Sequence, residues 1–395
     1  MIKEKIKQAI KILNEKNIDL WLIFVRESHT ITDPCLPLIL DASCTWQSAF
    51  LISATGNTTA IVGNLDYEAI KAKGAYQKVI SYKASIRDDL VKAITEINPE
   101  KIAINFSTND HISDGLTHGM YLLLQQYLKN TPFKDRFVSS EEIISAVRGR
   151  KSPAEIQRLK KAIAVTIEIF DSVPKILKTG LTEKQIAKFM FDQVKKKGVG
   201  LSWDPEHCPS VFTGPDTAGA HFGPTNRKTE PGHIMNMDFG VKINDYVSDL
   251  QRTWYFLREG ETAVPAEVQK AFNTVRNAIT KAAEFLKPGV EGWQVDDVAR
   301  QYIVSQGYDE YPHALGHQVG REAHDGAGVL CPRWERYGQL PYLKVEIGQV
   351  YTLEPRVTCE GHGIATIEEE VVVTEDGCEF ISPRQRELFL VSCLK

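Results

Sequence analysis

The stretch Asn236-Met-Asp-Phe-Gly-Val-Lys-Ile-Asn-Asp-Tyr-Val-Ser-Asp-Leu-Gln-Arg-Thr253 decides how the second half of the chain is interpreted. Two strand-like runs flank the turn dipeptide at 244–245, so the segment predicts a β-hairpin. Asp238 lies on the first run and Asp249 on the second, and a hairpin brings such carboxylates side by side. Neighbouring carboxylates are unfavourable unless a positive charge lies between them, and their hard oxygens suit divalent cations. The alternative is a solvated hairpin whose acidic residues bind nothing.

Histidines gather in a second segment, His313-Ala-Leu-Gly-His-Gln-Val-Gly-Arg-Glu-Ala-His-Asp325. It holds three of the ten histidines, His313, His317 and His324, with glycines between them. Glycine lets the backbone approach a ligand closely, and imidazole is both a metal ligand and a proton carrier near neutral pH. The segment therefore predicts metal ligation or acid–base chemistry, whereas a single histidine would more often be structural.

Two glutamate motifs extend the candidate set. Glu354 ends an apolar strand-like run and precedes a proline, an unusual place for a carboxylate without a function. Further on, three consecutive glutamates open a β-branched run that favours a strand. Because side chains alternate along a strand, Glu368 and Glu370 share one face while Glu369 points to the other. The alternative interpretation of this triplet is a charged edge strand.

These motifs follow the order Asp, Asp, His, Glu, Glu, which resembles the pita-bread metallopeptidases: aminopeptidase P, Xaa-Pro dipeptidase (prolidase), methionine aminopeptidase and creatinase. The resemblance is strong over about 150–395 and covers 1–150 only in outline. It implies two bound divalent metal ions, with manganese as the first expectation and cobalt or zinc as alternatives. The five implied metal ligands are Asp238, Asp249, His317, Glu354 and Glu368.

The resemblance also implies roles for residues around the metals. His221, which lies 17 residues before Asp238, matches a substrate-pocket histidine of the aminopeptidase P and prolidase branch. Catalytic roles are implied for His221, His324 and Glu354, with Glu354 as the proton acceptor from water. Substrate-binding roles are implied for His221, His313 and His324. The implied reaction is hydrolysis of the N-terminal peptide bond of a short peptide with proline second, by a Xaa-Pro dipeptidase or aminopeptidase.

Three positions depart from the family pattern. Thr366 stands where relatives commonly have arginine, Arg356 where glycine often follows the Glu-Pro pair, and Asp325 where glutamate is more usual. None is an implied metal ligand, so the departures bear on proline specificity more than on hydrolysis. Two rivals stay open: a creatinase-like C–N hydrolase that works without metal, and a non-catalytic binding protein on the same fold. Creatinases do not keep all five ligands and the binding relatives usually lose several, so this sequence disfavours both.

The expected fold has two parts. Strands alternate with helices over 1–150, which predicts an α/β N-terminal domain similar to that of creatinase. A basic segment with helix breakers marks the boundary, and Ser152 and Pro153 fit the start of a long helix. Residues 151–395 mix helices with strands rich in glycine and proline, and the resemblance implies an α+β pita-bread catalytic domain there.

Composition limits the class of protein. The 395 residues are 43% hydrophobic and 25% charged with a net charge of −4, which gives no basic face for nucleic acid. No run of 18 apolar residues predicts a membrane span, and the charged N-terminal stretch lacks the apolar core of a secretory signal. Seven scattered cysteines without a Cys-x-x-Cys pair fit reduced thiols in the cytoplasm. A homodimer is expected from the resemblance.

Overall fold

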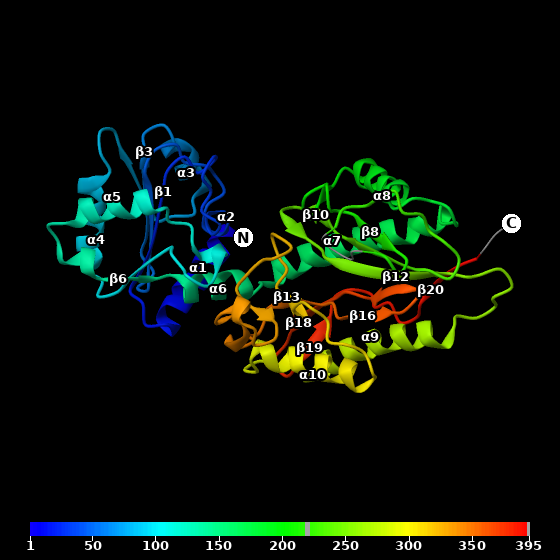
Figure 1. Ribbon diagram of the computed structural model, residues 1–395. Helices are drawn as coiled ribbons and strands as arrows, with labels where there is room; N and C mark the ends of the chain where they lie inside the picture. Colours follow the sequence, from blue (N-terminus) through cyan, green and yellow to red (C-terminus); the bar gives the residue numbers. More distant parts are fainter. Residues whose placement is uncertain (218–221, 393–395) are drawn as a thin grey trace. The chain divides into compact units, whose positions relative to one another are not determined.

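The computed structural model describes residues 1–217 and 222–392, and the chain divides into two compact units, Met1–Arg148 and Gly149–Lys395 (Figure 1). No helix within these described ranges is long and apolar enough to cross a membrane. The six cysteines outside the undescribed C-terminal residues are free thiols. Each unit has its own hydrophobic core, and each is described by itself.

The first unit is built on a six-stranded sheet with the order β4-β3-β2-β1-β5-β6. Strand β2 runs antiparallel to β1 and β3, whereas β4, β5 and β6 pair in parallel with their neighbours. The strands are β1 (Leu20–Val25), β2 (Ser48–Ser53), β3 (Thr58–Gly63), β4 (Lys78–Tyr82), β5 (Ile102–Ile104) and β6 (Phe137–Ser139).

Helices cover both faces of this sheet. Every residue of β1 is buried, and its side chains alternate between two cores, as expected for a central strand of a layered α/β structure. Helices α1, α2, α3 and α6 pack on one face, and α4 and α5 on the other. This arrangement confirms the predicted α/β fold. The helices are α1 (Ile2–Glu15), α2 (Leu36–Ile39), α3 (Tyr67–Lys73), α4 (Arg87–Ile97), α5 (His118–Leu128) and α6 (Glu141–Gly149).

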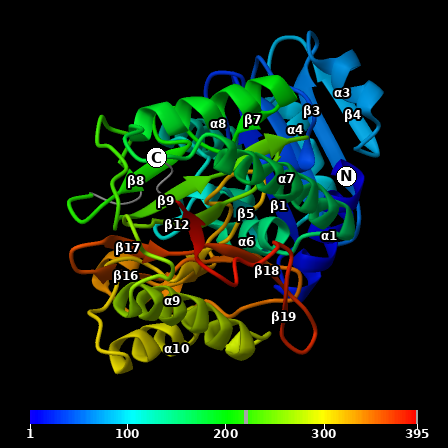
Figure 2. The same ribbon diagram turned by 90° about the vertical axis from the view of Figure 1, so that its right-hand side faces the viewer.

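The second unit has two pairs of helices with strands between them. In both views α7 and α8 lie on one side of the strands, and α9 and α10 lie on the other (Figures 1 and 2). Ser152 caps the first helix, as the sequence predicted, and Glu155 completes a capping box. The second pair of helices is formed by consecutive segments of the chain between 266 and 305. The four helices are α7 (Pro153–Ser172), α8 (Glu183–Lys197), α9 (Ala266–Phe285) and α10 (Gly292–Ser305).

The strands of the second unit form several small sheets, and among the described residues the four-stranded β20-β12-β9-β8 is the largest. Phe170 of α7 packs on Phe239 and Trp254, whereas the neighbouring Tyr255 belongs to the core under α9 and α10. The strands are β7 (Gly200–Leu201), β8 (Ser210–Thr213), β9 (Ile234–Phe239), β10 (Val241–Ile243), β11 (Tyr246–Val247), β12 (Leu250–Phe256), β13 (Gly316–His317), β14 (Val329–Leu330), β15 (Val350–Leu353), β16 (Arg356–Cys359), β17 (Gly363–Thr366), β18 (Glu369–Val373), β19 (Cys378–Phe380) and β20 (Phe389–Val391).

The predicted hairpin is present, but it is divided between two sheets. Asn244 and Asp245 have φ of 50° and 65° and join β10 to β11 in a tight turn. Beyond it, β9 pairs with β12 so that Asp238 lies opposite Gln251. The strands cross closely at Gly240, where a Cβ would lie 1.7 Å from the carbonyl oxygen of Ser248. A glycine is therefore required where the chain passes from one sheet to the other.

Candidate metal centre

Five strand ends of the second unit converge on one group of side chains. Asp238 lies in β9 and Asp249 directly precedes β12, while His317 ends β13. Glu354 directly follows β15, and Glu368 lies between β17 and β18. Residues that directly follow or precede a strand are held by the strand's hydrogen bonds while their side chains are free to converge. An isolated bridge between Gln251 and Glu368 ties the last of these segments to β12.

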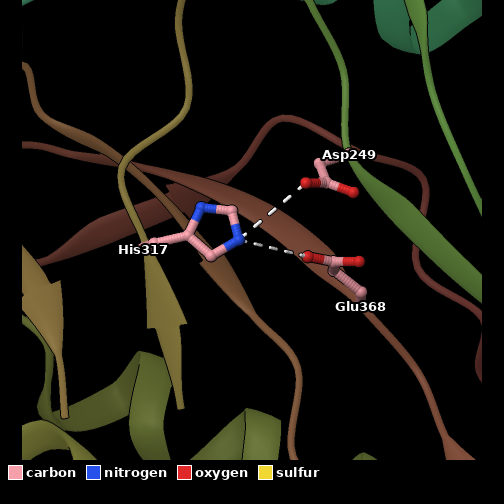
Figure 3. A group of neighbouring side chains, drawn as sticks. All are labelled: Asp249, His317 and Glu368. Atoms are coloured by element: carbon pink, nitrogen blue, oxygen red, sulfur yellow. Dashed lines mark ion pairs between the residues drawn. The ribbon is translucent and has the colours of Figure 1, made fainter. Parts of the chain in front are cut away.

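His317 is the centre of the group. Its Nε2 lies 3.2 Å from Oε1 of Glu354, 3.8 Å from Oδ2 of Asp249 and 4.0 Å from Oε1 of Glu368. One ligand atom from each of Asp249, His317 and Glu368 lies within 4.8 Å of the others (Figure 3). Asp238 joins them through a side-chain hydrogen bond with Asp249. The structure therefore brings together the five residues singled out as metal ligands in the sequence.

Burial makes this group of carboxylates electrostatically unfavourable by itself. Burial and then the charge of Glu354 raise the pKa of Asp238 to about 8. Burial and the neighbouring carboxylates also raise the pKa values of Asp249 and Glu368 well above their ordinary range. Several acids thus compete for protons in a volume where a cation would let them ionise.

The donor set fits a divalent cation. Oδ1 of Asp238 and Oε2 of Glu368 are buried and have no hydrogen-bond partner among the described residues. Buried polar atoms of this kind are rare in native proteins and need an explanation. Carboxylate oxygens with one imidazole suit manganese, zinc or cobalt, and the unpartnered oxygens provide lone pairs for such an ion.

His317 and Glu354 differ from the other members because they form an ion pair. Burial acts to lower the pKa of His317, but its hydrogen bond to Glu354 and the charge of that carboxylate raise the pKa overall. Burial likewise opposes ionisation of Glu354, but the hydrogen bond and charge of His317 hold the pKa of Glu354 below its ordinary value. Glu354 is therefore the member of the group that stays ionised most readily.

Comparison with known proteins identifies the family. The sequence model of metallopeptidase family M24 matches residues 157–375, more than half of the chain. The chain belongs to metallopeptidase family M24. It is therefore a metallopeptidase, as the order of its motifs predicted, and M24 enzymes use divalent metal ions.

Relatives of this M24 peptidase cover most of its length. An uncharacterized peptidase of Staphylococcus saprophyticus is 29% identical over 336 residues, which are 85% of this chain and 87% of the relative. The solved structure of a Xaa-Pro dipeptidase from Bacillus anthracis is similar with a TM-score of 0.76 at 23% identity. The match covers 99% of this chain and 100% of the dipeptidase chain. An X-Pro aminopeptidase from Thermotoga maritima has a TM-score of 0.72 at 25% identity, with 98% and 99% covered. The pita-bread fold and the N-terminal α/β domain are thereby confirmed.

The other predicted histidines of this M24 peptidase lie in different positions. The ring of His324 packs edge-on against that of His317, with centroids 4.3 Å apart. His313 is half-buried, its Nδ1 lies 2.8 Å from the carbonyl oxygen of Ala314, and burial lowers its pKa despite the charge of Glu354. His221 lies outside the described residues.

Several residues that support the group were missed by the sequence analysis. Gln251 donates to Oε2 of Glu354 at 3.5 Å and accepts from the hydroxyl of Thr366 at 3.1 Å. Thr352 accepts the N–H of His317 at 3.1 Å, and its hydroxyl donates to Oε1 of Glu354 at 3.3 Å. Strand alternation could have found Gln251, which is two residues after Asp249 on β12, and Thr352, which is two residues before Glu354.

The raised pKa values predict how the metal-free protein responds to pH. Between the ordinary Asp value of 3.8 and the pKa of about 8 for Asp238, the folded state holds a proton that the unfolded state has released. Stability of the metal-free protein should therefore fall as pH rises through this window. Metal binding requires ionised carboxylates, so the stabilisation by metal should be larger at pH 8 than at pH 5. Melting temperatures with chelator and with Mn²⁺ across this range test both trends, and a metal effect that shrinks toward pH 8 would contradict them.

Proposed function

We propose that this M24 metallopeptidase uses two divalent cations to hydrolyse the N-terminal peptide bond of short peptides, with proline favoured in the second position. The observation that carries the proposal is the buried group of carboxylates around His317, with two oxygens that have no hydrogen-bond partner among the described residues. The printed names of the solved neighbours, a Xaa-Pro dipeptidase and an X-Pro aminopeptidase, support the choice of substrate class. We expect manganese first, with cobalt or zinc as alternatives.

In this proposal the metals would be held by Asp238, Asp249, His317, Glu354 and Glu368. Bound divalent cations would polarise a carbonyl group and lower the pKa of a bound water. Glu354 would accept a proton from water, because the lowered pKa of its carboxyl group keeps it ionised.

The histidines would act on the substrate side of the site. We assign His324 to the oxyanion and the leaving amine, because its ring lies against that of His317. His313 would line the pocket for the residue after the scissile bond, and the lowered pKa of its imidazole keeps it neutral there. His221 is proposed from the sequence alone as a further substrate-binding and catalytic residue.

The test starts with protein stripped of metal and then loaded with Mn²⁺, Co²⁺ or Zn²⁺. We expect hydrolysis of Ala-Pro and Met-Pro only with metal, faster than that of Ala-Ala, and elemental analysis should find about two ions per chain. Activity that is unaffected by chelation, or hydrolysis of creatine, would favour the creatinase-like alternative. No hydrolysis of any peptide with any of the three metals would favour the non-catalytic alternative. The cytoplasmic homodimer expected from the sequence stays a prediction, for which sedimentation of the purified protein is a first measure.

A further inference from the structure

Arg356 lies beside the carboxylate group, on the face of the β16–β17 pair that carries Thr366. It opens β16 two residues after Glu354, and the charge of Glu354 acts on its guanidinium. Its Cα partner across the antiparallel pair β16–β17 is Thr366, which precedes Glu368 by two residues. Directly opposed residues of an antiparallel pair share a face. Thr366 donates to Gln251, which in turn donates to Glu354, so the face that Arg356 shares with Thr366 is the one next to the carboxylate group.

The guanidinium of Arg356 is half-buried yet has no hydrogen bond or ion pair among the described residues. Its positive charge is within electrostatic range of both Glu354 and His313. The hydrogen bonds of the neighbouring Glu354 are made with His317, Gln251 and Thr352, and not with Arg356. A partly desolvated guanidinium with five unused donors is a ready binding group for an anion, and a carboxylate matches its geometry in a two-pronged contact.

The position of Arg356 selects which end of a peptide it can bind. The amino end of a substrate is positive and would be repelled by a guanidinium but attracted by the carboxylate group. His313 is the residue proposed for the pocket after the scissile bond, and it lies close enough to Arg356 for that charge to act on its imidazole. In a dipeptide the terminal carboxylate lies one residue beyond the scissile carbonyl, at most about 3.6 Å along the chain. The carboxylate of a dipeptide therefore lies next to the scissile bond, whereas that of a longer peptide lies at least one residue further away.

We infer that Arg356 binds the C-terminal carboxylate of the substrate and thereby makes the protein select dipeptides over longer or amidated peptides. The inference rests on the proposed function and assigns to that site its substrate class. It also gives a role to the arginine at a position where the family pattern often has glycine.

The test compares Ala-Pro with Ala-Pro-amide in wild-type protein and in Arg356→Ala, both loaded with Mn²⁺. Loss of a charge-assisted, two-pronged hydrogen bond should raise KM for Ala-Pro by about 10–100-fold. KM for the amide, which has no carboxylate, should change less than about threefold, and kcat for both substrates should change little. Arg356→Lys should recover part of the loss for Ala-Pro because it keeps the charge but not the fork.

Direct binding gives a readout that does not depend on turnover. Calorimetry should find that wild-type protein binds proline more tightly than prolinamide, and that Arg356→Ala removes the difference. Arg386→Ala, which removes an exposed arginine, is the matched control and should leave both substrates and both ligands unchanged. Equal losses for the acid and the amide, or no loss for the acid, would overturn the inference while leaving the proposed function intact. A wild-type protein that hydrolyses neither substrate with any metal would instead overturn the proposed function, and the inference with it.

Discussion

Asp249→Asn is expected to lower metal-dependent kcat/KM by at least about a thousandfold, and the protein should remain folded. Asp249 is hydrogen-bonded to Asp238 and Glu368, and its Oδ2 lies 3.8 Å from Nε2 of His317. It therefore contacts three of the other four proposed ligands. An amide in its place keeps the shape but removes a charge that the proposed cations would need. Metal assistance is worth several kcal/mol, and each 1.4 kcal/mol corresponds to about tenfold in rate.

The stability of the same variant separates a lost ligand from a damaged fold. In the metal-free protein, burial and neighbouring acids raise the pKa of Asp249, so its ionised form destabilises the fold near neutral pH. Asp249→Asn should therefore melt at the same temperature as metal-free wild-type protein or higher. Addition of Mn²⁺ should raise the melting temperature of the wild type much more than that of the variant.

The matched control is Asp245→Asn, four residues earlier in the β10–β11 turn. Asp245 has φ of 65°, which asparagine tolerates, and its side chain is 66% exposed. The control should keep its activity and its response to Mn²⁺. If Asp249→Asn hydrolysed Ala-Pro at the wild-type rate with Mn²⁺, the ligand assignment would be wrong.

The sequence predicted which residues gather in this group better than it predicted which strand ends place them there. Strand alternation allowed either Glu368 or Glu370 as the last ligand, and only the family motif favoured Glu368. In the structure the carboxylate of Glu370 accepts the N–H of Asp249 at 2.8 Å, while Glu368 lies near His317. The choice depends on where β17 ends and β18 begins, and alternation alone carries no information about that break.

The edge-strand interpretation of the glutamate triplet is wrong. Strand β18 lies between β15 and β19, and Glu368, Glu369 and Glu370 are each no more than 1% exposed. Glu369 points to the other face, where it pairs with Arg252 at 3.3 Å and accepts from Ser382. The arginine is 117 residues away in sequence, so the partner that stabilises this buried charge could not be found from local pattern.

The contact that holds the histidine segment in place is also made by a residue far away in the sequence. The sequence indicates only that the segment before α7 is basic and contains helix breakers. In the structure Lys151 of this segment is buried, and its Nζ lies 2.7 Å from Oδ2 of Asp325. Asp325 follows His324 directly, and its N–H donates to the carbonyl oxygen of Gln318 at 2.8 Å. The pair therefore closes the segment that begins at His317 and ends at His324. A Cβ on Gly320 would lie 1.9 Å from Asp325 and 2.4 Å from Lys151, so the segment needs glycine to pass this pair.

Lys151→Met is expected to lower the free energy of unfolding by about 3–5 kcal/mol, because it leaves a buried carboxylate without its lysine. Both side chains are 1% exposed, so water cannot take the place of the ammonium group. The denaturant midpoint, measured on metal-free protein to exclude metal linkage, reports the loss. The exposed pair Lys188–Asp192 has an N–O distance of 2.6 Å with 72% and 49% exposure, so Lys188→Met should cost less than about 1 kcal/mol.

The double variant Lys151→Met/Asp325→Leu distinguishes a buried charge from lost packing. Replacing both members of a buried ion pair with apolar side chains of similar size is often neutral or stabilising, so the double variant should recover most of the stability that Lys151→Met loses. Recovery would show that the buried carboxylate that has lost Lys151, and not a cavity at residue 151, is the source of the loss. If the two substitutions were additive instead, the ion pair would not couple the boundary segment to the histidine segment. In the single variant Lys151→Met, activity should fall together with stability, because a displaced Asp325 would also displace His324 beside His317.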